Sequence, residues 1–340
     1  MLSPAYKLTV GRKVVDTTDE PRASTVVELS VRLDLDTPLD DCKLVLGNVG
    51  GVRPAVGDEA KVELGYADDD GGLTQVMEGT VVSSEPGLTT TRVLVDGGAA
   101  ALLRTFVEQT YEGKTAGAIV RDLAGKAGVR VAAAGDGIKF PAYVVDGRRS
   151  VYRHMRDLAD LSGFDLYVNA DGELAFEEFV GGKAVHVFEF AKHVVALEVT
   201  RAEPLAGRVE AWGESPTGSE GDDAWAWLTK DFTRSRGKAG DGPLLLLERP
   251  ALRTTEAART AAQAALTAIR RRTLRGRVLT IGRPQVKLGD AIRLRGMADE
   301  SLNTNFQVRS VEHRITKRGG FTTAVGFRAI EAPAAAGLGA

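Results

Sequence analysis

Two stretches of the chain follow one plan, and this duplication constrains the fold more than any other feature of the sequence. Arg53–Tyr66 reads RPAVGDEAKVELGY, and Arg283–Gly296 reads RPQVKLGDAIRLRG. In both, a proline and a Gly-Asp pair precede apolar residues at every second position, which is the pattern of a half-buried strand. The first stretch therefore predicts a turn followed by a strand, and the second predicts the same unit again.

Two more pairs of segments match in the same order. Met77–Val82 corresponds to Phe306–Val311, and Gly87–Val93 corresponds to Gly320–Val325. Three ordered matches predict a duplicated β-barrel. The alternative is that Gly-Asp turns and threonine-rich strands recur in any β protein.

Composition excludes several classes of protein. The chain has 340 residues, 43% of them hydrophobic and 26% charged, which is enough for more than one core. The net charge of −2 gives no overall attraction to nucleic acid or to an anionic membrane. No segment resembles a signal peptide or a membrane-spanning helix, so we expect folding in the cytoplasm and no membrane insertion. Cys42 is the one cysteine, which excludes an intrachain disulfide, and its place in an alternating strand predicts a buried side chain.

The periodicity of the chain changes near residue 98 and again near residue 185. Residues 1–98 alternate apolar and polar positions between frequent turns, as in a small antiparallel barrel. Thr115–Gly128 and Ser150–Gly163 have helical periodicity with capping residues at their ends, and a hairpin follows around Asn169–Gly172. Short strands then return, interrupted by an alanine-rich helix at about 255–272.

These changes predict an α+β, mainly β chain. We expect a first β-barrel domain over residues 1–98, an α+β insert over 99–184, a similar second β-barrel domain over 185–331 with the inserted helix, and a disordered tail over 332–340.

The sequence indicates no catalytic, cofactor-binding or metal-binding residue. The sequence has four histidines, His154, His186, His193 and His313. Their spacing is not that of metal ligands. The acidic turn at 68–70 and the turn at 169–172 lack the glutamate that completes a calcium loop. Glycoside hydrolysis needs two carboxylates facing one bond, but Glu177-Glu178 and Asp222-Asp223 are adjacent pairs, and neighbouring residues of a strand point to opposite faces.

A cluster of arginines is the one local feature that could bind nucleic acid. It consists of Arg270, Arg271, Arg272, Arg275 and Arg277. Such a cluster can equally complement the C-terminal end of the preceding helix or form ion pairs with a partner protein. No aromatic platform accompanies the cluster, and Trp225 and Trp227 share one face of a predicted strand, as packing residues do. We therefore expect no specific nucleic-acid partner.

Several segments resemble the phage late control D family, the baseplate hub proteins of contractile tails and contractile injection systems. The resemblance lies in VMEGTVVS at Val76–Ser83, the run Val95–Ala124, the run Ser150–Phe176 and the C-terminal stretch Gly282–His313. It extends over roughly residues 1 to 330 in the order barrel, α+β insert, barrel with an inserted helix.

The resemblance implies a non-enzymatic structural role without a cofactor. The family forms a homotrimeric ring in which two similar barrels per subunit alternate, so that a pseudo-sixfold surface joins a hexameric inner tube to a threefold spike. Because the chain stops at Ala340 soon after the second barrel, we expect the spike to be a separate protein, and baseplate wedge proteins to be further partners. Whether the particle is a phage tail, a tailocin or an extracellular injection system stays open. The alternative functions are a baseplate-associated peptidoglycan hydrolase and a nucleic-acid-binding multi-barrel protein.

Overall fold

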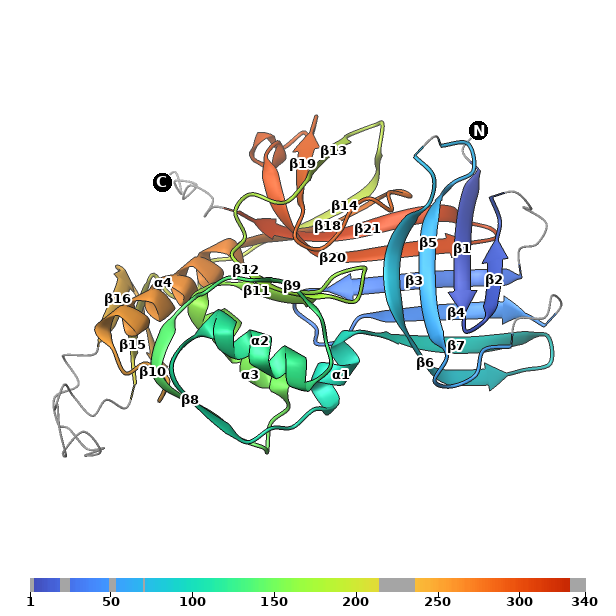
Figure 1. The fold of residues 1–340 in the computed structure, drawn as a ribbon. Helices are drawn as coiled ribbons and strands as arrows, with labels where there is room; N and C mark the ends of the chain where they lie inside the picture. The colour runs from blue at the N-terminus through green and yellow to red at the C-terminus, as the bar shows by residue number, and fades with distance from the viewer. Residues whose placement is uncertain (1–2, 19–24, 49–52, 70, 214–235, 331–340) are drawn as a thin grey trace.

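The computed structural model describes residues 3–18, 25–48, 53–69, 71–213 and 236–330, and the fold within these ranges is mainly β (Figure 1). The predicted fold class, mainly antiparallel β with an inserted α+β unit and a long helix, is confirmed. Asp222, Asp223, Trp225, Trp227 and the expected tail over 332–340 lie outside the described residues, so those expectations stay predictions.

The first β region is a curled sheet of seven strands. The strands are β1 (Pro4–Val10), β2 (Lys13–Asp16), β3 (Val26–Asp34), β4 (Asp41–Gly47), β5 (Glu59–Tyr66), β6 (Thr74–Pro86) and β7 (Thr90–Gly97). They pair in the order β3-β4-β7-β6-β5-β1-β2. Alternation places Leu29, Val31 and Leu33 of β3 in the core, while Ser30 and Arg32 between them point away from it.

The second β region repeats this plan. Its strands are β13 (Val185–Glu189), β14 (Val194–Arg201), β18 (Leu274–Ile281), β19 (Ala291–Arg295), β20 (Asn305–Thr316) and β21 (Gly320–Ala329), with a short 3-10 helix η2 (Glu300–Leu302) before β20. They pair in the order β14-β18-β21-β20-β19-β13, so β14, β18, β21, β20 and β19 take the places of β3, β4, β7, β6 and β5. One strand differs, because β13 runs parallel to β19 whereas β1 runs antiparallel to β5.

Irregularities of the two regions coincide. The β3–β4 ladder shifts register at Val26–Glu28, and the equivalent β14–β18 ladder shifts at Val194–Ala196. The β6–β7 ladder shifts at Val81–Ser83, and the equivalent β20–β21 ladder shifts at Val308–Ser310. Bulges re-aim a strand at one defined residue, so two coincident bulges support a true duplication over a chance similarity of β patterns.

The Gly-Asp turns are the same structure in both regions. Gly57 and Gly289 have φ angles of +95° and +87°, in the left-handed range that favours glycine. The carboxylates of Asp58 and Asp290 each accept a hydrogen bond from the backbone N–H three residues earlier, at 2.9 and 3.0 Å. The predicted equivalence of these turns is confirmed.

The sequence match of the second segment was wrong by two residues, since it paired Val81 with Ser310. The N–H of Val81 donates to the carbonyl of Asp58 at 2.8 Å, and the N–H of Val308 donates to the carbonyl of Asp290 at 3.1 Å. Val81 and Val308 are therefore equivalent. Matching by residue type fails here because position within a strand, and not side-chain identity, is what the two regions share.

The two β regions form one continuous sheet, a connection that the sequence did not predict. Ser310–Thr316 in the second half of β20 pairs antiparallel with Glu28–Asp34 of β3. This pairing joins both regions into a 13-stranded sheet that curls at its ends (Figure 1). Alternation of apolar residues identifies a strand but not its neighbour, so the junction was invisible in the sequence.

The α+β unit lies against one side of this sheet (Figure 1). Its elements are α1 (Ala99–Arg104), β8 (Gln109–Thr115), α2 (Ala116–Lys126), β9 (Val131–Ala134), β10 (Lys139–Val145), α3 (Val151–Ser162), β11 (Asp165–Val168) and β12 (Leu174–Glu177). The hydroxyl of Thr115 accepts from the N–H of Ala118 at 3.2 Å, and Gly163 ends α3 with a φ of +75°, as their capping patterns predicted. The predicted β11–β12 hairpin is confirmed.

The long helix α4 (Thr255–Arg271) packs on the α+β unit. Strands β15 (Arg208–Trp212), β16 (Gly237–Gly240) and β17 (Leu244–Glu248) form a small sheet beside it. Ala258 and Leu266 of α4 belong to the same core as Leu158 of α3, and that core is separate from the core of the 13-stranded sheet. Part of the predicted second barrel domain therefore shares the core of the insert, while the predicted domain boundaries themselves stay predictions.

Cys42 is fully buried on β4, in agreement with the sequence. Over the residues that the structure describes, no helix combines the length and apolar character needed to cross a bilayer.

Candidate assembly surfaces and the ionic junction

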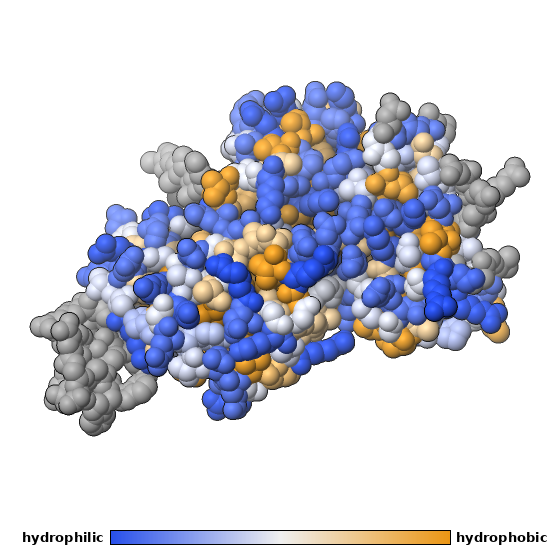
Figure 2. Space-filling model, in the orientation of Figure 1, coloured by the Kyte–Doolittle hydropathy of each residue, from blue (hydrophilic) through white to orange (hydrophobic). Residues whose placement is uncertain are grey.

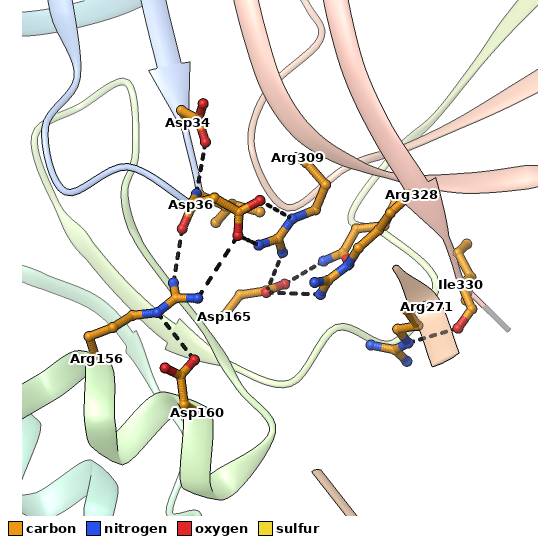
Figure 3. Close-up of polar contacts among 11 residues, drawn as sticks. Asp34, Asp36, Arg156, Asp160, Asp165, Arg271, Arg309, Arg328 and Ile330 are labelled. Atoms are coloured by element: carbon orange, nitrogen blue, oxygen red, sulfur yellow. Dashed lines mark hydrogen bonds and ion pairs between the residues drawn. The ribbon is translucent and has the colours of Figure 1, made fainter. Parts of the chain in front are cut away.

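An ionic junction connects the two β regions to the α+β unit (Figure 3). Arg309 of β20 lies at its centre, with Asp36 from the turn after β3 on one side and Asp165 of β11 on the other. The distance between Arg309 Nη1 and Asp165 Oδ1 is 2.8 Å, and the Arg309 side chain is only 7% exposed. One guanidinium thus bridges carboxylates from two different parts of the fold.

Neighbouring side chains complete the junction. Arg328 of β21 donates through Nε to the side-chain amide oxygen Oε1 of Gln307 at 2.8 Å, and its Nη2 lies 3.6 Å from Asp165 Oδ1. Arg156 of α3 donates to the carbonyl of Leu35 at 2.9 Å. The contacts of Asp165 with Arg309 and Arg328, and that of Arg156 with Leu35, join the α+β unit to the sheet and so help to fix how the unit sits on it.

Burial and neighbouring charges act in opposite directions on the pKa values of the junction. Burial alone would raise the pKa of Asp36, but the hydrogen bond and charge of Arg309 outweigh it and hold that pKa below its usual range. Burial, reinforced by the charge of Arg309, lowers the pKa of Arg328 to about 9. The junction therefore keeps its central ion pair charged at neutral pH and serves structure rather than proton transfer.

Glu177 of the glutamate pair is held by two neighbouring side chains. Glu177 accepts a hydrogen bond from the Tyr167 hydroxyl at 2.8 Å and pairs with Lys183 Nζ at 2.6 Å. Asp165 lines the same pocket, but it is held by Arg309. Glu177 and Asp165 thus each have a cationic partner, Lys183 and Arg309.

The four histidines contact different parts of the fold and do not form one site. His154 contacts the carbonyl of Asp146, and His313 is buried beside the Thr323 hydroxyl at 3.0 Å. His186 bonds Asp290 at 2.9 Å and thereby ties β13 to the Gly-Asp turn. Among the described residues, no group of His, Cys, Asp and Glu side chains is placed to hold a metal ion.

The arginine cluster is divided between structural contacts and the surface. Arg271 donates to the carbonyl of Ile330 at 2.8 Å, and Arg277 pairs with Glu312 at 2.6 Å. Arg272 and Arg275 line a groove that also contains acidic side chains. The face shown in Figure 2 is mostly hydrophilic with scattered apolar groups.

Sequence reasoning did not find the junction. The partners that connect its different parts lie 121 to 273 positions apart, as with Arg156 and Leu35 or Arg309 and Asp36. Arg309 itself gave no signal, because it stands among other polar residues of β20, such as Gln307 and Glu312.

The fold of the chain is similar to that of solved tail proteins. The 43 kDa tail protein of prophage MuSo2 from Shewanella oneidensis matches over 96% of this chain and 98% of its own, with a TM-score of 0.72 and 15% identity. A tail protein from Neisseria meningitidis MC58 matches over 96% of each chain, with a TM-score of 0.71 and 12% identity.

A third structure comes from a secretion system. The E. coli c3393 protein, described as a component of the type VI secretion system with structural similarity to the T4 bacteriophage tail proteins gp27 and gp5, matches over 94% of this chain and 76% of its own, with a TM-score of 0.62 and 10% identity. No protein-family model and no curated protein sequence matches the chain. At such low identity these structures establish the fold alone, which this chain shares with two tail proteins and a type VI secretion system component.

Proposed function

We propose that this protein is the structural hub of a phage-tail-like baseplate, a homotrimeric ring that joins a hexameric inner tube to a central spike. The observation that carries the proposal is the duplicated β region, with the same strand order, two coincident bulges and the same Gly-Asp turns. Three chains with two such regions each present six similar units, so a threefold ring can meet a sixfold partner.

The ionic junction supports the same role. A ring that transmits load between a tube and a spike needs its parts held in fixed orientation, and Arg309 connects both β regions to the α+β unit. The similarity of the fold to tail proteins from two bacterial sources adds independent support. A separate spike protein and baseplate wedge proteins are the partners that we infer from the sequence resemblance, and production in the bacterial cytoplasm followed by incorporation into the particle is the corresponding location.

Light scattering of the purified protein tests the trimer. A trimer of the 36.1 kDa chain has a mass of about 108 kDa. A monomer or a hexamer at micromolar concentration would contradict the proposal. Clearing of peptidoglycan by the isolated chain in a zymogram, or DNA binding that persists in moderate salt, would favour one of the alternative functions instead.

A further inference from the structure

Among the strand edges without a partner in the described residues, two belong to strands whose equivalents pair with each other inside the chain. Strand β14 ends the sheet beyond β18, so its outer edge is free. The second half of β6 is free as well, because its pairing with β5 stops at Thr80 while its pairing with β7 continues to Pro86. Unpaired edges expose N–H and C=O groups that can pair with another strand.

The interior of the chain contains the partner that each free edge lacks. Strand β20 is equivalent to β6, and its second half pairs with β3. Strand β3 is equivalent to β14. Inside the chain, β20 of the second region therefore pairs with β3 of the first region. The equivalents of these two strands, β6 of the first region and β14 of the second, are the strands with free edges.

Equivalent residues give the register of the missing pairing. Ser310 takes the place of Ser83, because they pair with equivalent residues of β21 and β7 after the shared bulge. Leu33 of β3 takes the place of Arg201 of β14 by the same reasoning. The observed pair Val311–Leu33 translates into Ser84–Arg201, and the observed pair Glu312–Arg32 translates into Glu85–Thr200.

Backbone directions agree at both edges. In the junction inside the chain, the N–H of Leu35 donates to the carbonyl of Arg309 at 2.9 Å. The N–H of Ala202 points back to Thr273 beside β18, so by alternation Arg201 and Val199 direct their backbone groups to the free edge. The N–H of Gly87 points to Thr90 beside β7, so Ser84 and Pro86 face outward. Pro86 lacks an N–H, which removes one hydrogen bond of the ladder and leaves its carbonyl available.

Apolar side chains at both edges are exposed where their counterparts inside the chain are covered. Leu88, in the turn after Pro86, is fully exposed, and Val195 of β14 is 61% exposed. Leu197 and Val199 are only partly buried, whereas the equivalent Leu29 and Val31 of β3 are completely buried by the internal junction. A partner strand would cover these side chains and remove apolar surface from water.

We propose that the second half of β6 pairs antiparallel with β14 of a second copy of this chain, in the register Ser84–Arg201 and Glu85–Thr200. The two edges lie at opposite ends of the run of strands from β14 to β6, so the contact is head-to-tail, and in the proposed trimer it closes into a ring after three copies. This inference rests on the proposed trimer and adds to it the strands that hold the subunits together.

Cysteine cross-linking tests the register. Glu85 and Thr200 are both exposed and form a pair whose backbone groups do not bond each other, where Cα atoms lie ~4.5 Å apart and a disulfide fits. Oxidation of the E85C/T200C double variant should give covalent dimers and then trimers on a non-reducing gel. The matched control is S84C/T200C, because Ser84 lies on the opposite face of β6 and should cross-link at least tenfold more slowly. Cys42 is retained, since it is fully buried and is common to both variants.

The outcomes separate this inference from the proposed function. Trimers by light scattering together with fast cross-linking of E85C/T200C support both. Trimers in which the two double variants cross-link at the same slow rate overturn the strand pairing and leave the trimeric hub standing. A monomeric protein overturns both.

Discussion

Arg309 is the residue on which the arrangement of the fold depends most. Its guanidinium is 7% exposed and contacts Asp36 and Asp165. Replacing one partner of a buried ion pair leaves unbalanced charge and costs ~3–5 kcal/mol, whereas an exposed pair contributes ~0–1 kcal/mol.

We therefore expect Arg309→Met to lower the free energy of unfolding by several kcal/mol. The matched control is Arg314→Met on the same strand, which removes the exposed pair with Glu28 and should cost about 1 kcal/mol or less. Urea denaturation followed by circular dichroism measures both. Equal losses for the two variants would contradict the structural role of the junction.

Asp40 makes the stability of the protein depend on pH. Burial raises the pKa of its carboxyl to about 7, even though the N–H of Asp34 donates to it at 2.9 Å. At pH values between 3.8, the pKa in the unfolded state, and about 7, the carboxyl of Asp40 is protonated in the folded state and ionised in the unfolded state. The free energy of unfolding therefore falls as the pH rises from about 4 to about 7.

Asp40→Asn should remove this contribution, because the amide oxygen can still accept from Asp34 and carries no charge. We expect the variant to be more stable than the original protein at pH 8, by on the order of 2 kcal/mol, and nearly equal to it at pH 4. Denaturation curves at the two pH values measure the difference. If the difference in the free energy of unfolding between the two proteins is the same at pH 4 and pH 8, Asp40 does not titrate between these pH values.

At the scale of single elements, the two Gly-Asp turns allow a comparison inside one chain. A Cβ at Gly57 would meet no atom within 4 Å, whereas a Cβ at Gly289 would lie 2.4 Å from the Tyr167 hydroxyl. Both glycines have positive φ, so both substitutions carry backbone strain of ~1–2 kcal/mol.

Gly289→Ala should therefore destabilise the protein more than Gly57→Ala, by at least 1 kcal/mol, since only the first adds a steric clash. Thermal unfolding of the two variants side by side gives the comparison. The double variant Gly289→Ala/Tyr167→Phe tests the cause, because removing the hydroxyl should recover part of the loss. If the double variant is no more stable than Gly289→Ala, the clash with the Tyr167 hydroxyl is not the cause of the loss.

Elements that depend on local signals could be predicted from the sequence. The turns at Gly57 and Gly289 and the helix ends at Thr115 and Gly163 all follow from residues with restricted or unusual backbone preferences. These turns and helix ends could be predicted because the residues that determine them lie within a few positions of them in the sequence.

Elements that depend on distant partners could not be predicted. The pairing of β20 with β3, the packing of α4 on the α+β unit and the contacts of Arg309 all join residues far apart in the chain. A strand pattern states which face is buried, but not which strand covers it. The exposed edge at β14 was missed for the same reason.

At the scale of the whole molecule, the exposed Leu88 tests the contact between subunits. It stands at the turn after β6, where the proposed interface would cover it. Leu88→Asp should weaken the trimer at least tenfold, because a charge would replace an apolar side chain in the contact.

The matched control is Val180→Asp, which changes an 82% exposed apolar residue of the segment after β12 that lies outside the proposed interface. Analytical ultracentrifugation over a range of concentrations gives the dissociation of both variants. Equal weakening by the two substitutions would argue against a specific contact at Leu88.

An electron-microscopy reconstruction of the purified oligomer tests the central claim most directly. The account predicts three chains in a closed ring, with the first and second β regions alternating at about sixty-degree intervals. Strand β6 of each chain should lie beside β14 of the next. A ring of six chains, or a trimer in which the β regions of different chains do not alternate, would contradict it.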